Sequence, residues 1–77
     1  MKYTKILDDT WYYLENNYKG SEITLELWLS LIEKHSNSTN CLKKCIKIIW
    51  SEWEFYDNNL KDYYKKYIKR TYGVIVK

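Results

Sequence analysis

The 77-residue sequence has no proline, two glycines, one methionine, one histidine and two cysteines. No apolar run approaches the roughly 20 residues of a membrane-spanning helix, so the sequence predicts no membrane span. The first residues, 1–5, are followed by Ile6 and Leu7 and then by two aspartates, so the apolar segment of a signal peptide is missing. We therefore expect a cytoplasmic protein with no membrane contact.

The signatures of nucleotide binding and of nucleophilic catalysis are also missing. There is no Walker motif, no dinucleotide glycine pattern and no nucleophile elbow. Asp8 and Asp9 are adjacent, so on a helix they diverge by about 100° and do not share an acid–base or metal site. We interpret His35 as a residue that satisfies carbonyl groups at a helix end. The sequence thus predicts a protein that is not an enzyme and needs no cofactor.

The two cysteines, Cys41 and Cys45, are four residues apart and share one helix face. A zinc site takes four ligands, usually from two such pairs, and His35 is the only further nitrogen ligand available. We interpret the pair as buried thiols beside Leu42 and Ile46. Half of a metal site and an oxidative or interchain role are the alternatives.

Aromatic side chains are abundant: nine tyrosines, four tryptophans and one phenylalanine. A chain of 9.5 kDa buries about 63 % of its unfolded surface. Domains of this size usually need an additional source of stability. Here the candidates are the aromatic side chains, the cysteines and oligomerisation.

Helical periodicity runs through the first half of the chain. Residues 3–18 carry apolar side chains three or four positions apart, and Gly20 is suited to a left-handed residue after the helix. Residues 22–35 form a second apolar stripe, for which Ser21 or Thr24 can provide the N-cap. This stretch also alternates as a strand would, but its leucines and glutamates favour a helix. Its wide apolar arc predicts a central helix.

The second half keeps a heptad-like register over eight positions: Leu42, Ile46, Ile49, Trp53, Tyr56, Leu60, Tyr63 and Tyr67. Two structures fit this pattern. One is a long or kinked helix over 41–72, and the other is two helices broken at 57–59, where Asn59 and Asp62 resemble a capping box. We favour the long helix because the register continues. Gly73 ends it, and the β-prone tail 74–77 is either frayed or docked on another chain.

The sequence therefore predicts a single all-α domain over 1–77, with three to four helices and a long or kinked C-terminal one. We expect one core containing Trp11, Leu29, Ile46, Ile49 and Trp53. A helix of 32 residues spans about 48 Å, more than helices of 15 residues can cover. The uncovered stripe would be apolar, so we also predict a homodimer along residues 53–70.

Charge is distributed unevenly. Residues 1–40 have four lysines and six acids, whereas residues 41–77 have eight lysines, one arginine and four acids. Tyrosines 63, 64, 67 and 72 interleave with the basic residues, a pattern typical of surfaces that neutralise phosphates and stack bases. The alternatives are an acidic protein partner, or an ordinary amphipathic helix with outward lysines. The candidate binding residues are Lys61, Lys65, Lys66, Lys69, Arg70 and Tyr64.

A second basic cluster consists of Lys43, Lys44 and Lys47, preceded by Asn40. It opens a predicted helix and follows the helix at 22–35 after a polar connector of five residues, 36–40. This order is similar to that of a helix-turn-helix DNA reader. The alternative is that these lysines form only the polar side of their helix.

In its length, aromatic richness, absence of catalytic motifs and abundance of Lys, Asn, Tyr and Ile, the chain resembles small phage or mobile-element inhibitors, including anti-CRISPR proteins. The resemblance implies a compact, cofactor-free protein that occupies a host nuclease or its nucleic-acid groove. The net charge of +3 excludes DNA mimicry by an acidic surface. We expect an interaction module that binds a nucleic-acid-handling protein or its RNA; the alternative is a small DNA- or RNA-binding regulator.

Overall fold

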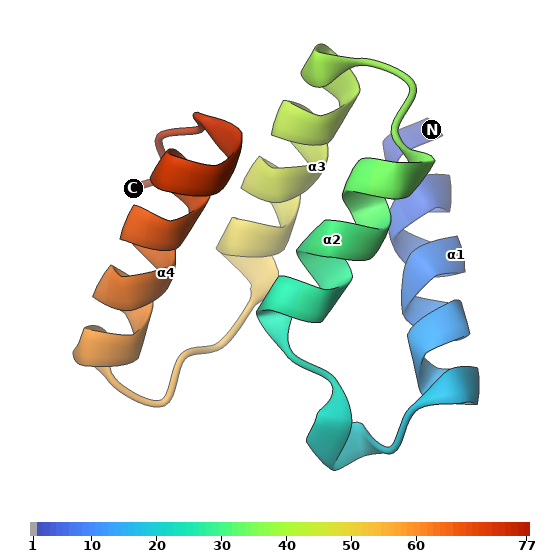
Figure 1. Cartoon of the computed structure of the whole chain (residues 1–77), viewed down its shortest axis with the longest axis horizontal. Coiled ribbons are helices and arrows are strands. Elements are labelled where there is room, and N and C mark those ends of the chain that lie inside the picture. Colours follow the sequence, from blue (N-terminus) through green and yellow to red (C-terminus); the bar gives the residue numbers. More distant parts are fainter. Residues whose placement is uncertain (1) are drawn as a thin grey trace. The chain divides into compact units, whose positions relative to one another are not determined.

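The computed structural model describes residues 2–77, with side chains from Tyr3 onward. Four α-helices follow one another: α1 (Lys2–Asn17), α2 (Leu25–His35), α3 (Thr39–Glu52) and α4 (Asn58–Tyr72) (Figure 1). A short 3₁₀ turn, η1 (Gly20–Glu22), precedes α2, and no strand occurs between residues 2 and 77. The predicted all-α fold is confirmed.

By its internal contacts the chain divides into two compact units, Met1–Cys45 and Ile46–Lys77. The boundary lies within α3, so each unit contains part of that helix. The single domain expected over 1–77, and the single core expected within it, stay predictions.

The first unit is organised by α1 and α2, which lie side by side and run in opposite directions (Figure 1). Thr10 is fully buried between apolar side chains. Its hydroxyl donates to the Ile6 carbonyl oxygen at 2.7 Å and accepts a hydrogen bond from Trp28 Nε1 at 2.9 Å. The Trp28 ring also contacts the Trp11 ring, with centroids 4.9 Å apart. A polar bond and an aromatic pair therefore join α1 to α2 beside the leucine core, which comprises Leu7, Leu14, Leu25 and Leu29.

The connection between α1 and α2 corrects one prediction and confirms another. Gly20 does not adopt the left-handed conformation. It begins η1 instead, where the Lys19 backbone N–H donates to Glu22 Oε1 at 2.7 Å. Thr24 is the N-cap of α2, and its hydroxyl accepts the Leu27 N–H at 3.1 Å. The helix therefore begins three residues later than predicted, because η1 ends at Glu22 and the extended residues Ile23 and Thr24 separate it from α2.

The predicted long helix over 41–72 is wrong. α3 ends at Glu52 and α4 begins at Asn58, so residues 53–57 are not helical. Asp57 is extended, with φ −148°, and its carboxylate accepts the Leu60 N–H at 2.7 Å. This N-cap satisfies a donor that has no partner inside the new helix. The two helices of the alternative are confirmed, but the break lies at residues 53–57 rather than 57–59, and the cap is Asp57 and not Asn59.

The core of the second unit contains Trp50, not the predicted Trp53. Trp53 follows the end of α3 and is only partly buried. The Trp50 ring is 8 % exposed, and its centroid lies 5.0 Å from that of Phe55. Phe55 in turn contacts Tyr64, with centroids 6.0 Å apart. An aromatic chain thus fills the space between the end of α3 and α4, beside the buried residues Ile46, Ile49 and Ile68.

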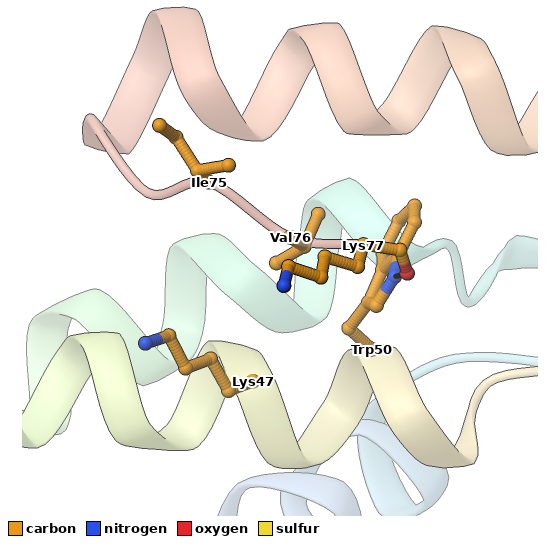
Figure 2. A pocket seen from close by; sticks show the side chains of 5 residues that line it. All are labelled: Lys47, Trp50, Ile75, Val76 and Lys77. Atoms are coloured by element: carbon orange, nitrogen blue, oxygen red, sulfur yellow. Dashed lines mark hydrogen bonds between the residues drawn. The ribbon is translucent and has the colours of Figure 1, made fainter.

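The C-terminal tail is docked within its own unit, so the prediction that it is frayed or bound to another chain is wrong. Gly73 ends α4 as predicted, with φ 70° in the left-handed region. Val74 and Val76 are buried, and Trp50 Nε1 donates to the Lys77 carbonyl oxygen at 2.7 Å. Figure 2 shows the tail passing over the Trp50 ring. An indole N–H and two valines therefore hold the tail in place.

Candidate functional site

The α4 basic face consists of Lys61, Lys65, Lys66, Lys69 and Arg70, all exposed. α4 buries Tyr64 and Ile68. Because successive residues of a helix are about 100° apart, the five cations occupy much of the remaining circumference. Lys61 lies at one margin, where its ammonium nitrogen is 5.9 Å from the centroid of the Trp50 ring. The five predicted binding cations are therefore on one exposed helix surface.

The charges of the α4 basic face are not neutralised by ion pairs. No carboxylate among residues 2–77 lies within 4.0 Å of its five cationic groups, whereas on α1 Lys5 pairs with Asp9 at 3.1 Å. The second unit has six lysines and one arginine against four acids, a formal charge of +3. The first unit has six lysines and six acids, a formal charge of zero. The excess positive charge of the chain is thus located in the unit that contains α4.

Tyr64 was predicted to bind a partner, but the structure places it in the core of its unit. Its side chain is 8 % exposed and packs on Phe55 and on the edges of two further tyrosine rings. The exposed ring is that of Tyr63, which is 50 % exposed. The heptad pattern had placed Tyr63 on the stripe that the first two helices leave uncovered and had assigned it to the homodimer. The Tyr63 ring lies nearly parallel to that of Tyr67, with centroids 6.4 Å apart and an interplanar angle of 17°. A helical wheel drawn for α4 alone would have identified Tyr63 as the exposed tyrosine.

The second predicted cluster is divided between the two units. Lys43 and Lys44 are exposed in the first unit, together with Asn40. The Lys44 ammonium lies 5.7 Å from the centroid of the Tyr3 ring. The connector between α2 and α3 has three residues, 36–38, rather than the predicted five. The helix-turn-helix interpretation stays a hypothesis.

Lys47, the third member of that cluster, is exposed in the second unit. It lines a hollow of about 320 Å³ together with Trp50, Ile75, Val76 and Lys77 (Figure 2). Two lysines, one tryptophan and two aliphatic residues line the hollow, and no Asp, Glu or His side chain is among them.

The histidine and the two cysteines lie in positions that packing and helix ends explain. His35 Nδ1 lies 3.0 Å from the Leu31 carbonyl oxygen, as expected of a residue at a helix end. Cys41 and Cys45 are free and buried, which confirms their interpretation as core thiols. Among residues 2–77, no three His, Cys, Asp or Glu side chains are grouped as metal ligands would be.

Burial, with a smaller contribution from Cys41, raises the pKa of the Cys45 thiol from its ordinary value of 9.0 to about 11. Between these values the unfolded chain loses its proton while the folded chain keeps it, so the free energy of unfolding falls as pH rises. Between pH 9 and pH 11, the free energy of unfolding of the wild type should therefore fall by about 2 kcal/mol more than that of Cys45→Ala. Urea denaturation of both proteins at several pH values measures this difference. Parallel losses in the two proteins would show that the thiol does not contribute.

Comparison of the chain with protein-family models, with curated proteins and with solved structures finds no significant match. None of the helices in residues 2–77 combines the length and the apolar character that a membrane span requires.

Proposed function

We propose that this chain is a non-enzymatic binding protein whose α4 basic face engages nucleic-acid phosphates. Through that contact it would obstruct a nucleic-acid-handling protein, in the manner of the phage inhibitors that the sequence resembles. The observation that supports the proposal is the set of five exposed cations on α4 with no carboxylate within 4.0 Å. The exposed Asp62 lies on the same side of α4, three residues before Lys65 and four before Lys66, but it is not within ion-pair distance of either lysine. The five cations therefore bind an anion without first breaking an ion pair.

The arrangement of these cations favours an elongated anion. Lys61, Lys65 and Lys69 are four residues apart, so they rise about 6 Å per step along the helix axis. Lys66 and Arg70 repeat the same step beside them. Nucleic acids carry closely and regularly spaced phosphates, and neutralising them releases counterions, which drives binding. We place this activity in the host cytoplasm, as the sequence predicts.

The small-regulator alternative would use the same α4 basic face, and it differs in acting on nucleic acid without a protein target. The homodimer predicted along residues 53–70 is not part of the proposal. It depended on the stripe of a continuous 32-residue helix, and that helix is broken at residues 53–57.

Salt dependence of binding tests the proposal. Fluorescence anisotropy with labelled single-stranded RNA, single-stranded DNA and duplex DNA should be measured between 50 and 200 mM KCl. If four or five phosphates are neutralised, the logarithm of the affinity should fall with the logarithm of salt with a slope of about −3 on single strands. Polyglutamate is the control, because it is a polyanion that carries carboxylates and no phosphates. No binding to any oligonucleotide at 50 mM salt, or equally strong binding to polyglutamate, would contradict the proposal.

A further inference from the structure

The Tyr63 ring is held by its neighbours while half of its surface faces solvent. The Tyr67 ring lies nearly parallel to it, with an interplanar angle of 17°. The Tyr64 ring is nearly perpendicular to it, with ring centroids 5.2 Å apart and an interplanar angle of 80°. Tyr64 is buried and Tyr67 is partly buried, so the two supporting rings belong to the packed side of α4. A ring that is already oriented loses less conformational entropy when a ligand stacks on it.

Tyr63 also borders the α4 basic face. Lys66 is three residues further along the helix, a separation that makes two side chains neighbours on a helix surface. Arg70 is seven residues further, two turns along nearly the same line and about 10 Å away along the axis. A strand that follows this side of α4 would pass the Tyr63 ring with its phosphates beside Lys66 and Arg70. The helix thus presents an aromatic ring and two cations in one row.

We propose that Tyr63 is a stacking platform for an unpaired base and that the ligand of the α4 basic face is therefore a single-stranded nucleic acid. This inference rests on the proposed function. A base within a duplex has both of its faces covered by its neighbours, whereas an unpaired base has a face free to stack on an aromatic side chain. Such stacking tolerates any sequence because every base has an aromatic face. The phosphates supply affinity, and Tyr63 supplies the preference for single strands.

The experiment compares two oligomers of equal charge, a twelve-nucleotide oligo(dT) and an abasic strand of the same length. Tyr63→Ala should weaken binding of oligo(dT) by about 5- to 150-fold, the range for one stacked base. The same variant should leave binding of the abasic strand unchanged, and it should leave the salt slope unchanged because no cation is removed. Tyr63→Phe keeps the ring and should bind like wild type. The matched control is Tyr12→Ala, which removes a 69 % exposed tyrosine from α1.

A measurement on the unaltered protein keeps the inference testable if Tyr63→Ala loses its fold in thermal melts. Ultraviolet crosslinking to a 5-bromouracil oligonucleotide should attach the base to the peptide that contains Tyr63. Crosslinks confined to other peptides, tighter binding of duplex DNA than of oligo(dT), or equal wild-type affinity for oligo(dT) and the abasic strand would each overturn the stacking role. If RNA and duplex DNA as well as these two oligomers fail to bind at 50 mM salt, the proposed function fails too; if only these two oligomers fail to bind, the stacking role alone is overturned.

Discussion

Trp50→Ala should leave the protein largely unfolded at 25 °C. The indole is 8 % exposed, packs on Phe55 with centroids 5.0 Å apart, and donates to the Lys77 carbonyl oxygen at 2.7 Å. Truncation of a buried tryptophan costs about 3–5 kcal/mol, and a domain of this size has about 5 kcal/mol in total. Urea denaturation followed by circular dichroism at 222 nm measures the loss.

Two further variants separate the contributions of this side chain. Trp50→Phe keeps most of the aromatic volume but removes the N–H donor to the tail, so we expect a loss of about 1 kcal/mol. Trp53→Ala is the matched control, because this tryptophan lies outside the helix and is only partly buried. It should cost distinctly less than Trp50→Ala. A larger loss for Trp53→Ala would show that Trp53, as the sequence pattern implied, is the core residue.

The helices of the first half could be predicted because their apolar side chains follow the helical period and Thr24 offers a cap. The gap between α3 and α4 was harder to predict. Trp53 and Tyr56 continue the heptad spacing across residues that are not helical, so the register does not reveal the break. The start of α4 is marked by Asp57, whose carboxylate accepts a hydrogen bond from the Leu60 N–H, and this bond is seen only in the structure. Local capping prevailed over the long-range pattern because it satisfies a backbone donor.

The side-chain roles in the second unit depend on contacts between residues far apart in the chain. The Trp50–Lys77 hydrogen bond joins residues 27 positions apart and docks a tail whose own composition suggests only a strand. Once Phe55 packs on α4, Tyr64 becomes a core residue and Tyr63 is left at the surface. By contrast, the exposure of the five α4 cations could be predicted from their charge, since unpaired lysines and arginines are rarely buried.

The double variant Lys65→Glu/Lys69→Glu should abolish most nucleic-acid binding while the fold is retained. Both side chains are exposed and lie on the α4 basic face. On a single strand each phosphate contact contributes about 0.7 to the salt slope, so losing two contacts at 50 mM salt should lower affinity about 60-fold. The two new carboxylates repel the phosphates and deepen this loss. Anisotropy titrations at several salt concentrations measure both the affinity and the slope.

The matched control is Lys19→Glu/Lys34→Glu, which changes the net charge by the same amount on the first unit. Lys34, like Lys69, lies in the last turn of its helix, so both double variants place one carboxylate at an unfavourable helix end. Melting temperatures of the two should remain close to that of wild type, because exposed charges contribute little to stability. If the control loses as much affinity as the α4 variant, binding depends on overall charge alone. If neither loses affinity, the α4 lysines only keep the protein in solution, and Asn40, Lys43, Lys44 and Lys47 become the residues to test.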